Sequence, residues 1–329
     1  MTVNMNSDNS ILITGAAGFV GFHLAKRLLD GGALVAGIDN INNYYDPGLK
    51  RARLAELEKY PLFEFEEGDI SHADEVRNAF KKFKPKIVVN LAAQAGVRYS
   101  ITNPQVYIDS NITGFFNILE VCREYKPAHL VYASSSSIYG NQQKIPFSVA
   151  DKTDTPISLY AATKKSNELM AFTYAHLYSI PCTGLRFFTV YGPYGRPDMA
   201  YFMFAKNIID GIPIKVFNNG DLYRDFTYVD DITKCLEIIL YKPPEGEDPA
   251  RVYNIGNSSP ERLSDFIQIL EDIIGINAVK EYLPMQEGDV YQTYADVADL
   301  TETFGFQPNT NIKTGLARFV KWYREYYGK

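Results

Sequence analysis

The stretch ILITGAAGFVG, residues 11–21, runs from a short apolar segment through three glycines into the start of an amphipathic one. The segment ILIT predicts a buried strand, and the apolar residues that recur every four positions from Val20 predict a helix. Between them, Gly15, Gly18 and Gly21 permit a tight turn and a close approach of the backbone to a pyrophosphate at the helix N-terminus. A plain turn of small residues is the alternative, and the flanking strand and helix argue against it. The stretch therefore predicts a dinucleotide-binding turn.

The rest of the first half repeats this rhythm of short apolar runs and longer amphipathic segments. The further runs are ALVAGID from Ala33, KIVVNLAA from Lys86, HLVYASS from His129 and CTGLRFF from Cys182. Such alternation predicts an α/β fold, a Rossmann-like doubly wound parallel sheet with helices on both faces. After about residue 186 turn-rich strings break the rhythm. We therefore expect a first domain over residues 8–185 and a smaller C-terminal substrate-binding domain over 186–329, with some segments returning to the first.

Composition limits the classes of function. The chain has 329 residues, 46% of them hydrophobic and 22% charged, which is typical of a globular protein. A net charge of −6 argues against a nucleic-acid partner. No apolar run approaches the roughly 20 residues that span a bilayer, and the first residues lack a signal peptide's features, so no membrane partner is expected. Three scattered cysteines predict neither disulfides nor a zinc site and favour a cytoplasmic protein, and four scattered histidines lack metal-ligand spacing.

Asp39 ends the second predicted strand, where an acidic side chain accepts hydrogen bonds from the adenosine ribose hydroxyls. A carboxylate there repels the 2′-phosphate of NADP, so the sequence favours NAD as cofactor. The alternative is that Asp39 caps a turn in the segment DNINNYYDP, residues 39–47.

The segment SLYAATKKSNE, residues 158–168, places Tyr160 and Lys164 four positions apart in a predicted helix. Residues at that spacing share a helix face, so the ammonium of Lys164 can favour the phenolate of Tyr160 and lower its pKa. Tyr160 is then a candidate general base. An ordinary surface pair is the alternative for these two residues taken alone.

Five strings in this order resemble the extended short-chain dehydrogenase/reductase family over nearly the whole chain. They are GxxGxxG at 15–21, GDI at 68–70, NLAA at 90–93, SSSSIYG at 134–140 and the Tyr160/Lys164 pair. The resemblance implies that Lys164 also binds the nicotinamide ribose, and that Ser135, with Ser136 and Ser137 as rivals, bonds the reacting sugar oxygen. The NAD contacts that it implies are Gly15, Ala17, Gly18, Phe19, Val20, Gly21, Asp39, Asn40, Asn42, Asp69, Ile70, Leu91, Ala92, Ala93, Tyr160 and Lys164.

The residues before the shared Tyr-Gly pair indicate the reaction. Family members that dehydrate or decarboxylate nucleotide sugars usually carry an acidic residue there, whereas this chain has Ser137 and Ile138. The missing acid favours 4-epimerisation. In that reaction Tyr160 takes the proton of the sugar 4-hydroxyl, C4 gives hydride to NAD, the 4-keto sugar rotates, and hydride returns to its other face.

The substrate is indicated by segments that look like those of UDP-glucuronate 4-epimerases, starting at Asp39, Gln94 and Arg186. Thr189 and Arg196 are suited to hold the sugar carboxylate through charge-assisted hydrogen bonds. A surface ion pair of Arg196 with Asp198, and a turn capped by Thr189, form the alternative. The substrate contacts that the resemblance implies are Arg98, Ser135, Thr189, Arg196, Arg224 and Asp289.

Other functions stay open at this point. A UDP-galactose or UDP-N-acetylglucosamine 4-epimerase would share every catalytic residue named above, and a non-catalytic dinucleotide-sensing protein would share the fold. The family resemblance also implies a homodimer formed through helices near residues 103–125 and 160–178.

Overall fold

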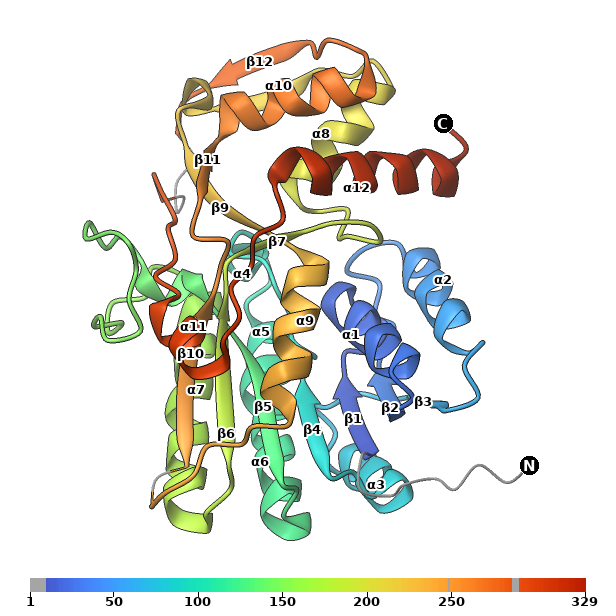
Figure 1. Cartoon of the computed structure of the whole chain (residues 1–329), viewed down its shortest axis with the longest axis vertical. Helices are drawn as coiled ribbons and strands as arrows, with labels where there is room; N and C mark the ends of the chain where they lie inside the picture. Colours follow the sequence, from blue (N-terminus) through green and yellow to red (C-terminus); the bar gives the residue numbers. More distant parts are fainter. Residues whose placement is uncertain (1–9, 248, 286–289) are drawn as a thin grey trace. The chain divides into compact units, whose positions relative to one another are not determined.

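A seven-stranded sheet dominates the computed structural model, which describes residues 10–247, 249–285 and 290–329 (Figure 1). The strands lie in the order β10-β6-β5-β4-β1-β2-β3, and the pairings among β3, β2, β1, β4 and β5 are parallel. The chain winds outward from β1 in one direction to β3 and in the other direction from β4, which confirms the doubly wound α/β prediction. The strand bounds are β1 Ser10–Thr14, β2 Leu34–Asp39, β3 Phe63–Glu67, β4 Ile87–Asn90, β5 His129–Ser135, β6 Cys182–Phe187 and β10 Ala250–Ile255.

Five of these strands are the predicted apolar runs, and two are additional. In β1 and β4 every residue is buried, as expected where helices cover both faces of a parallel sheet. The additional strand β3 (FEFEE) alternates Phe with Glu and is only partly buried at the sheet edge. The additional strand β10 comes from the second half of the chain and lies beside β6 at the opposite edge.

Helices cover the two faces of the sheet (Figure 1). One hydrophobic cluster joins α3, α6 and α7 to the strands, through residues such as Phe80, Phe115 and Ala171. On the other face α1 contacts β1, β2 and α2, and Arg27 of α1 bonds Thr233 of α9. The helices of this region are α1 Phe19–Asp30, α2 Pro47–Leu57, α3 Ala73–Phe83, α4 Tyr99–Thr102, α5 Gln105–Tyr107, the π-helical turn η2 Ile108–Thr113, α6 Gly114–Tyr125, the 3₁₀ turn η3 Ser136–Tyr139, α7 Leu159–Tyr178 and α9 Val229–Leu240.

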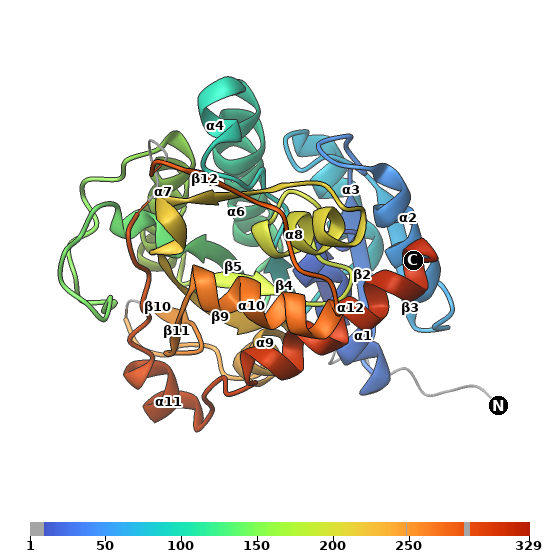
Figure 2. The same ribbon diagram turned by 90° about the horizontal axis from the view of Figure 1, so that it is seen from above.

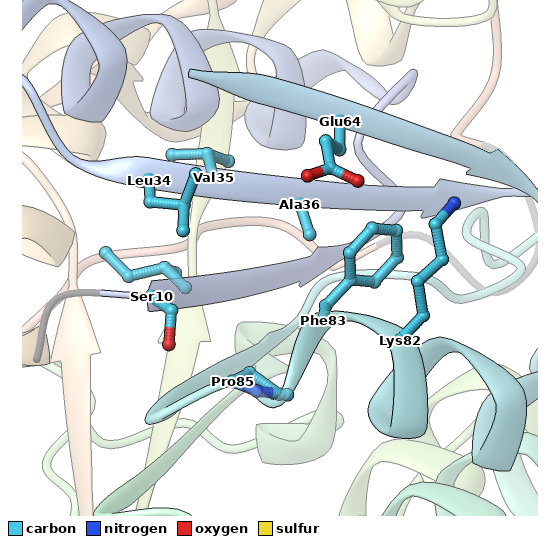
Figure 3. Close-up of a pocket in the computed structure, with 9 residues that line it drawn as sticks. Ser10, Leu34, Val35, Ala36, Glu64, Lys82, Phe83 and Pro85 are labelled. Carbon is cyan, nitrogen blue, oxygen red and sulfur yellow. The ribbon is translucent and has the colours of Figure 1, made fainter. Parts of the chain in front are cut away.

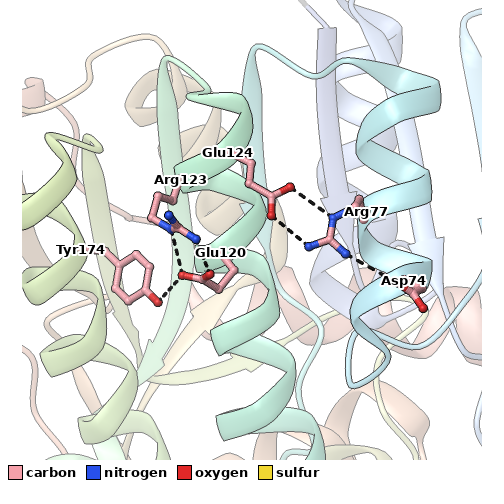
Figure 4. Close-up of polar contacts among 6 residues, drawn as sticks. All are labelled: Asp74, Arg77, Glu120, Arg123, Glu124 and Tyr174. Atoms are coloured by element: carbon pink, nitrogen blue, oxygen red, sulfur yellow. Dashed lines mark hydrogen bonds and ion pairs between the residues drawn. The ribbon is translucent and has the colours of Figure 1, made fainter.

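At the surface, α6 is connected to α3 by an ion pair and to α7 by a hydrogen bond (Figure 4). Arg77 of α3 reaches Glu124 of α6 at 2.9 Å. Toward α7, Glu120 pairs with Arg123 and accepts a 2.6 Å hydrogen bond from Tyr174 of that helix. Because exposed pairs contribute at most about 1 kcal/mol each, the apolar cluster beneath them does most to hold these helices in place.

The chain divides into two compact units that do not follow a single cut. The first comprises the residues up to Gly140, Lys152–Arg186 and Thr233–Tyr253, and the second comprises Asn141–Asp151, Phe187–Ile232 and Asn254–Lys329. The early segment 141–151 joins the second unit because Phe147 exchanges backbone hydrogen bonds with Tyr294 and Asp296.

The second unit contains two small sheets and a group of helices. Strands β11, β9 and β7 form one sheet, and β12 and β8 form the other. Helix α10 packs against both α8 and α12 (Figure 2), and Phe226 stacks on Phe266 at 4.4 Å between ring centroids. The bounds are β7 Thr189–Tyr191, α8 Ala200–Ile209, β8 Ile214–Phe217, the 3₁₀ turn η4 Asn218–Gly220, β9 Tyr223–Tyr228, β11 Pro260–Arg262, α10 Leu263–Ile274, β12 Lys280–Leu283, α11 Ala298–Phe304 and α12 Ile312–Tyr327.

Candidate active site

The carboxyl ends of the parallel strands gather most of the predicted residues of the first unit. Thr14, the last residue of β1, lies opposite both Ile38 of β2 and Asn90 of β4. The residues that follow each strand therefore emerge at one edge of the sheet, which is where doubly wound folds bind their ligands. The predicted glycine turn, Asp39, Asp69, Leu91 to Ala93 and Ser135 to Ser137 all lie at or just beyond these strand ends.

The glycine turn fits only glycine at its three positions. Gly15 adopts a φ of +74°, and a Cβ there would lie 2.7 Å from the backbone nitrogen of Ala92. Gly18 caps the N-terminus of α1, and a Cβ on Gly21 would lie 2.1 Å from the carbonyl oxygen of Gly15. The start of α1, with Phe19 buried, thus packs directly onto the turn. The three glycines therefore let the turn pack closely against the start of α1 and the residues after β4, as a dinucleotide-binding turn requires.

Asp39 is buried, with 8% of its surface exposed, and both its oxygens accept backbone hydrogen bonds. Oδ2 accepts from the nitrogen of Ala17 at 3.1 Å, and Oδ1 accepts from the nitrogen of Ile41 at 2.9 Å. Burial raises the pKa of Asp39, against the opposing effects of Lys50 and of these backbone bonds. Asp39 therefore ties the end of β2 to the glycine turn and aims a carboxylate at the same edge.

Two cations near Asp39 were missed by sequence reasoning. Arg53 of α2 is fully buried, and its Nη1 donates to the carbonyl oxygen of Ala17 at 2.8 Å and to the hydroxyl of Tyr45 at 2.7 Å. Lys50, one turn earlier, is also buried, and burial lowers its pKa. The sequence of α2 gave no sign that these two cations would be buried, because charged residues in a weakly amphipathic segment usually face solvent.

The remaining predicted cofactor contacts form a hydrogen-bonded rim. The side chain of Asn40 donates to Asp69 at 2.7 Å, and Asn42 accepts from Lys50 at 2.8 Å. Although burial opposes it, the bonds from Asn40 and Ser71 hold the pKa of Asp69 below its usual range. The backbone nitrogens of Leu91 and Ala92 donate to Thr14, which orders the turn after β4. Ile70 is buried, and Val20 and Ala93 are partly exposed.

The three candidate serines lie in one short turn that follows β5. Ser135 is the last residue of β5 and caps η3, because its Oγ accepts a hydrogen bond from the nitrogen of Ser137 at 3.1 Å. The same Oγ donates to the hydroxyl of Ser137 at 3.1 Å. Ser135 is 7% exposed, and Ser136 and Ser137 are partly exposed.

Tyr160 and Lys164 occupy the first two turns of α7. Ser158 caps this helix by accepting from the nitrogen of Ala161, which places Tyr160 at the partly exposed helix start. Lys164 is only 3% exposed, and its Nζ donates to the carbonyl oxygen of Ala133 in β5 at 2.9 Å. Burial lowers the pKa of Lys164 to about 8. The ammonium is therefore held by the strand that carries the serines as well as sharing a helix face with Tyr160.

Asn111 supports the same helix and was not predicted. It lies in the π-helical turn η2, where its side chain bonds the backbone of Gln94 and donates to Thr163 Oγ1 at 3.0 Å. Thr163 in turn donates to the carbonyl oxygen of Tyr160 at 2.8 Å. A π-helical turn often marks a functional site, but its sequence, IDSNIT, carries no signal of it.

The predicted substrate residues lie in both units. Arg98 of the first unit is exposed just before α4. In the second unit Thr189 begins β7, and Arg224 of β9 donates to the carbonyl oxygens of Tyr223 and Tyr291. Arg196 forms a two-bond ion pair with Asp198, with distances of 3.0 and 2.5 Å. This is the ion pair that the sequence offered as the alternative to a contact with the sugar carboxylate. The sixth predicted contact, Asp289, falls outside the described residues.

A separate hollow of about 180 Å³ lies at the opposite ends of the strands (Figure 3). It is lined by the first residues of β1 and β2 together with Glu64, Lys82, Phe83 and Pro85, and includes no predicted site residue.

Within the described ranges, no group of three or more His, Cys, Asp or Glu side chains is arranged to hold a metal ion. The same ranges contain no helix of the length and apolar character needed to cross a membrane.

A glycine turn at a helix N-terminus, a strand-end carboxylate and a Tyr-Lys helix on a doubly wound sheet define a dinucleotide-dependent protein of the Rossmann type. More particularly, the chain belongs to the NAD dependent epimerase/dehydratase family, which matches residues 11–256.

Relatives and solved structures agree with this assignment. The chain is 52% identical to "Protein CapI" of Staphylococcus aureus over 97% of this chain and 99% of that protein. It is 48% identical to UDP-glucuronate 4-epimerase 4 of Arabidopsis thaliana, over 98% of this chain and 77% of that protein. The crystal structure of UDP-glucuronic acid 4-epimerase from Bacillus cereus, in complex with UDP-glucuronic acid and NAD, superimposes with a TM-score of 0.90 at 32% identity, covering 97% of this chain and 100% of that one.

Proposed function

We propose that this protein is an NAD-dependent 4-epimerase that interconverts UDP-glucuronate and UDP-galacturonate through a 4-keto intermediate. The observation that carries the proposal is the apposition of the Tyr160–Lys164 helix and the Ser135–Ser137 turn, through the bond from Lys164 to Ala133, at the strand ends that also carry the glycine turn. The similarity to proteins named UDP-glucuronate 4-epimerases supports the choice of sugar.

The residues at the strand ends fit NAD. The lack of room for Cβ atoms at Gly15 and Gly21 makes the turn tight, and we propose that the backbone of this turn lies against the pyrophosphate. Asp39 presents an oriented carboxylate to a ribose diol and would repel a 2′-phosphate. We propose that Asp69, Ile70 and the turn Leu91 to Ala93 complete the contacts. NAD bound there would supply the hydride acceptor for C4 of the sugar and the hydride donor for the return step.

Tyr160 supplies the base. Its phenolate takes the proton from the sugar 4-hydroxyl as C4 is oxidised, and the resulting phenol gives the proton back when the ketone is reduced. Lys164 supports this by keeping a positive charge on the same helix face, since a pKa of about 8 leaves it mostly protonated at pH 7. Ser135 donates its one hydroxyl proton to the same sugar oxygen, which requires its hydrogen bond with Ser137 to reverse so that the hydroxyl of Ser137 becomes the donor.

The serine turn also explains why epimerisation is favoured over elimination. Removal of the C5 proton of a 4-keto sugar needs an acid or base beside the turn. Ile138 is buried where related enzymes carry a carboxylate, and Ser136 and Ser137 supply only neutral hydroxyls. The turn can therefore bind the sugar without driving a second reaction.

Thr189 and Arg196 are proposed to hold the sugar carboxylate in the second unit, with Arg224 and Asp289 on the nucleotide. The guanidinium of Arg196 is held by Asp198, so a substrate carboxylate must replace that partner in the same two-bond geometry. Asp198→Asn removes the competing charge and should lower KM for UDP-glucuronate, whereas an unchanged KM would contradict this exchange.

The test of the function is product analysis with purified protein. UDP-glucuronate should be converted to a mixture with UDP-galacturonate without added cofactor, at a kcat/KM above that for UDP-glucose or UDP-N-acetylglucosamine. Preference for a neutral sugar would refute the substrate assignment while leaving the Tyr160 chemistry intact. Absence of turnover with all three would refute the enzymatic proposal.

We also propose a homodimer that pairs the outer faces of α6 and α7. These faces carry four large apolar side chains that are 45–60% exposed, namely Phe116, Leu169, Phe172 and Leu177. Exposed apolar groups gathered in this way often mark a protein–protein interface. The expected mass in solution is twice the 37.2 kDa of the chain, and Phe172→Glu should halve it. A cytoplasmic location is proposed because Cys122 and Cys182 are buried and carry free thiols.

A further inference from the structure

A buried ion pair lies directly behind the serine turn. Glu168 of α7 is 7% exposed and Arg186 at the end of β6 is 4% exposed. Nε of Arg186 lies 2.9 Å from Oε1 of Glu168, and Nη2 lies 2.9 Å from Oε2, so the guanidinium grips both carboxylate oxygens. Lys165 is a more distant neighbour at 3.9 Å. Because apolar residues often stabilise a core as well as a buried pair does, stability alone gives no reason for these charges.

Both members of the pair reach the ends of the serine turn. Oε1 of Glu168 accepts a 2.7 Å hydrogen bond from the hydroxyl of Ser134, the residue before the turn. Nη1 of Arg186 donates to the hydroxyl of Tyr139, the last residue of the turn, at 2.9 Å. The three candidate hydroxyls of Ser135 to Ser137 therefore lie between two anchors that belong to one ion pair.

The pair also fixes the helix that carries the base. Tyr160, Lys164 and Glu168 follow one another at four-residue intervals and so share one face of α7. Lys164 bonds the carbonyl oxygen of Ala133, and Glu168 bonds the side chain of the next residue, Ser134. Two successive contacts on the helix thus engage two successive residues of β5 and set the register between them.

We propose that Glu168 and Arg186 are positioning residues for the reaction, which hold the Tyr160 helix and the serine turn at the separation needed to contact one sugar oxygen. The inference rests on the proposed function, in which Tyr160 and Ser135 bind the same atom. Misplacement by about 1 Å can cost about 10²-fold in rate. The pair touches neither sugar nor cofactor in this scheme, so its loss falls on kcat rather than on binding.

The experiment compares three variants of the full chain. Tyr139→Phe removes only the hydroxyl that anchors the end of the turn, and Glu168→Gln removes the charge that grips Arg186. The double variant Glu168→Leu with Arg186→Met replaces the pair by apolar groups, which restores core packing without restoring the anchors. Glu271→Gln is the matched control, since Glu271 is 4% exposed and paired with Lys280 at 2.9 Å in the second unit.

The expected result is a fall in kcat of about tenfold or more for Glu168→Gln and for the double variant, with KM for UDP-glucuronate and bound NAD changed by less than about twofold. Tyr139→Phe should show a smaller fall of the same kind, and Glu271→Gln should retain wild-type kcat. A double variant that is as stable as wild type and equally active would overturn the proposal. If the double variant does not fold, wild-type kcat in Tyr139→Phe and Glu168→Gln overturns it instead.

Hydrogen exchange separates this proposal from the assignment of function. If wild type does not convert UDP-glucuronate, the proposed function fails, and the anchors are still tested by exchange of the peptide covering residues 134–140. Faster exchange there in Glu168→Gln and Tyr139→Phe, at unchanged melting temperature, supports the anchoring role. Exchange equal to wild type refutes it whatever the substrate is.

Discussion

Acidification should destabilise the protein through His129, which is buried between two partners in the central sheet. The ring is 1% exposed, with Nδ1 3.0 Å from the carbonyl oxygen of Leu240 and Nε2 2.8 Å from Thr183 Oγ1. A carbonyl can only accept, so Nδ1 carries the proton and Nε2 accepts from the threonine hydroxyl. Protonating Nε2 would place a positive charge in a site without solvent, and the hydroxyl of Thr183 would have to rotate to accept its hydrogen bond.

The size of the effect follows from the pKa. Burial lowers the pKa of His129 from 6.5 to about 4, against the opposing bond to Leu240. Between pH 6.5 and 4 the unfolded chain therefore binds a proton that the folded chain does not. The free energy of unfolding consequently decreases as the pH is lowered through this range. Each pH unit costs at most about 1.4 kcal/mol, so the full loss is about 3 kcal/mol. The stability is fully present above pH 6.5 and the loss levels off below pH 4.

The assay is urea unfolding from pH 7.5 to 4, compared between wild type and His129→Asn. Asparagine keeps a donor for the carbonyl oxygen of Leu240 but does not titrate, so the variant is less stable at pH 7.5 and has a flatter dependence on pH. Asp225, whose pKa burial raises to about 6, changes stability in the opposite sense and cancels in the comparison. Parallel pH dependences for the two proteins would refute the assignment to His129.

Three further predictions concern the site. Tyr160→Phe should lower kcat by a factor on the order of 10² with little change in KM, and unchanged turnover would exclude Tyr160 as the base. Gly21→Ala places a Cβ 2.1 Å from the carbonyl oxygen of Gly15, so the purified variant should release less than about a tenth of the wild-type NAD on denaturation. The control Gly31→Ala, whose Cβ would lie 3.4 Å from its nearest neighbour, the carbonyl oxygen of Leu28, should release the wild-type amount. Arg196→Ala should raise the activation free energy for UDP-glucuronate by about 2–5 kcal/mol while sparing UDP-glucose, and equal losses with both sugars would show that Arg196 does not select the carboxylate.

Much of the first unit was predictable because its signals are local. A buried parallel strand is a continuous apolar run, and five such runs were found. Strand β3 was missed although its Phe-Glu alternation has the period of a half-exposed strand, since it is short and rich in charge. Strand β10 could not be placed from sequence, because its pairing with β6 joins residues some 70 positions apart and leaves no local pattern.

The site shows the same division between local and distant information. The spacing of Tyr160 and Lys164 predicted a shared helix face, but only the folded chain shows that Lys164 is buried against Ala133. Arg53 and Asn111 were missed because their roles depend on partners 36 and 17 residues away. Sequence reasoning left Arg196 with two possible partners, and its pairing with Asp198 depends on the local chain path after β7.

The two backbone bonds to Asp39 restrict how cofactor preference can be redesigned in this chain. Replacing Asp39 by a cationic residue that binds a 2′-phosphate would leave the backbone nitrogens of Ala17 and Ile41 without their acceptors. Each unsatisfied donor would cost about 1–3 kcal/mol of folding free energy. It would also put a third positive charge beside Lys50 and Arg53, which are buried. A single substitution of Asp39 is therefore not enough to change the cofactor from NAD to NADP. The loop after β2 must also be redesigned, because the same carboxylate sets the cofactor preference and holds that loop to the glycine turn.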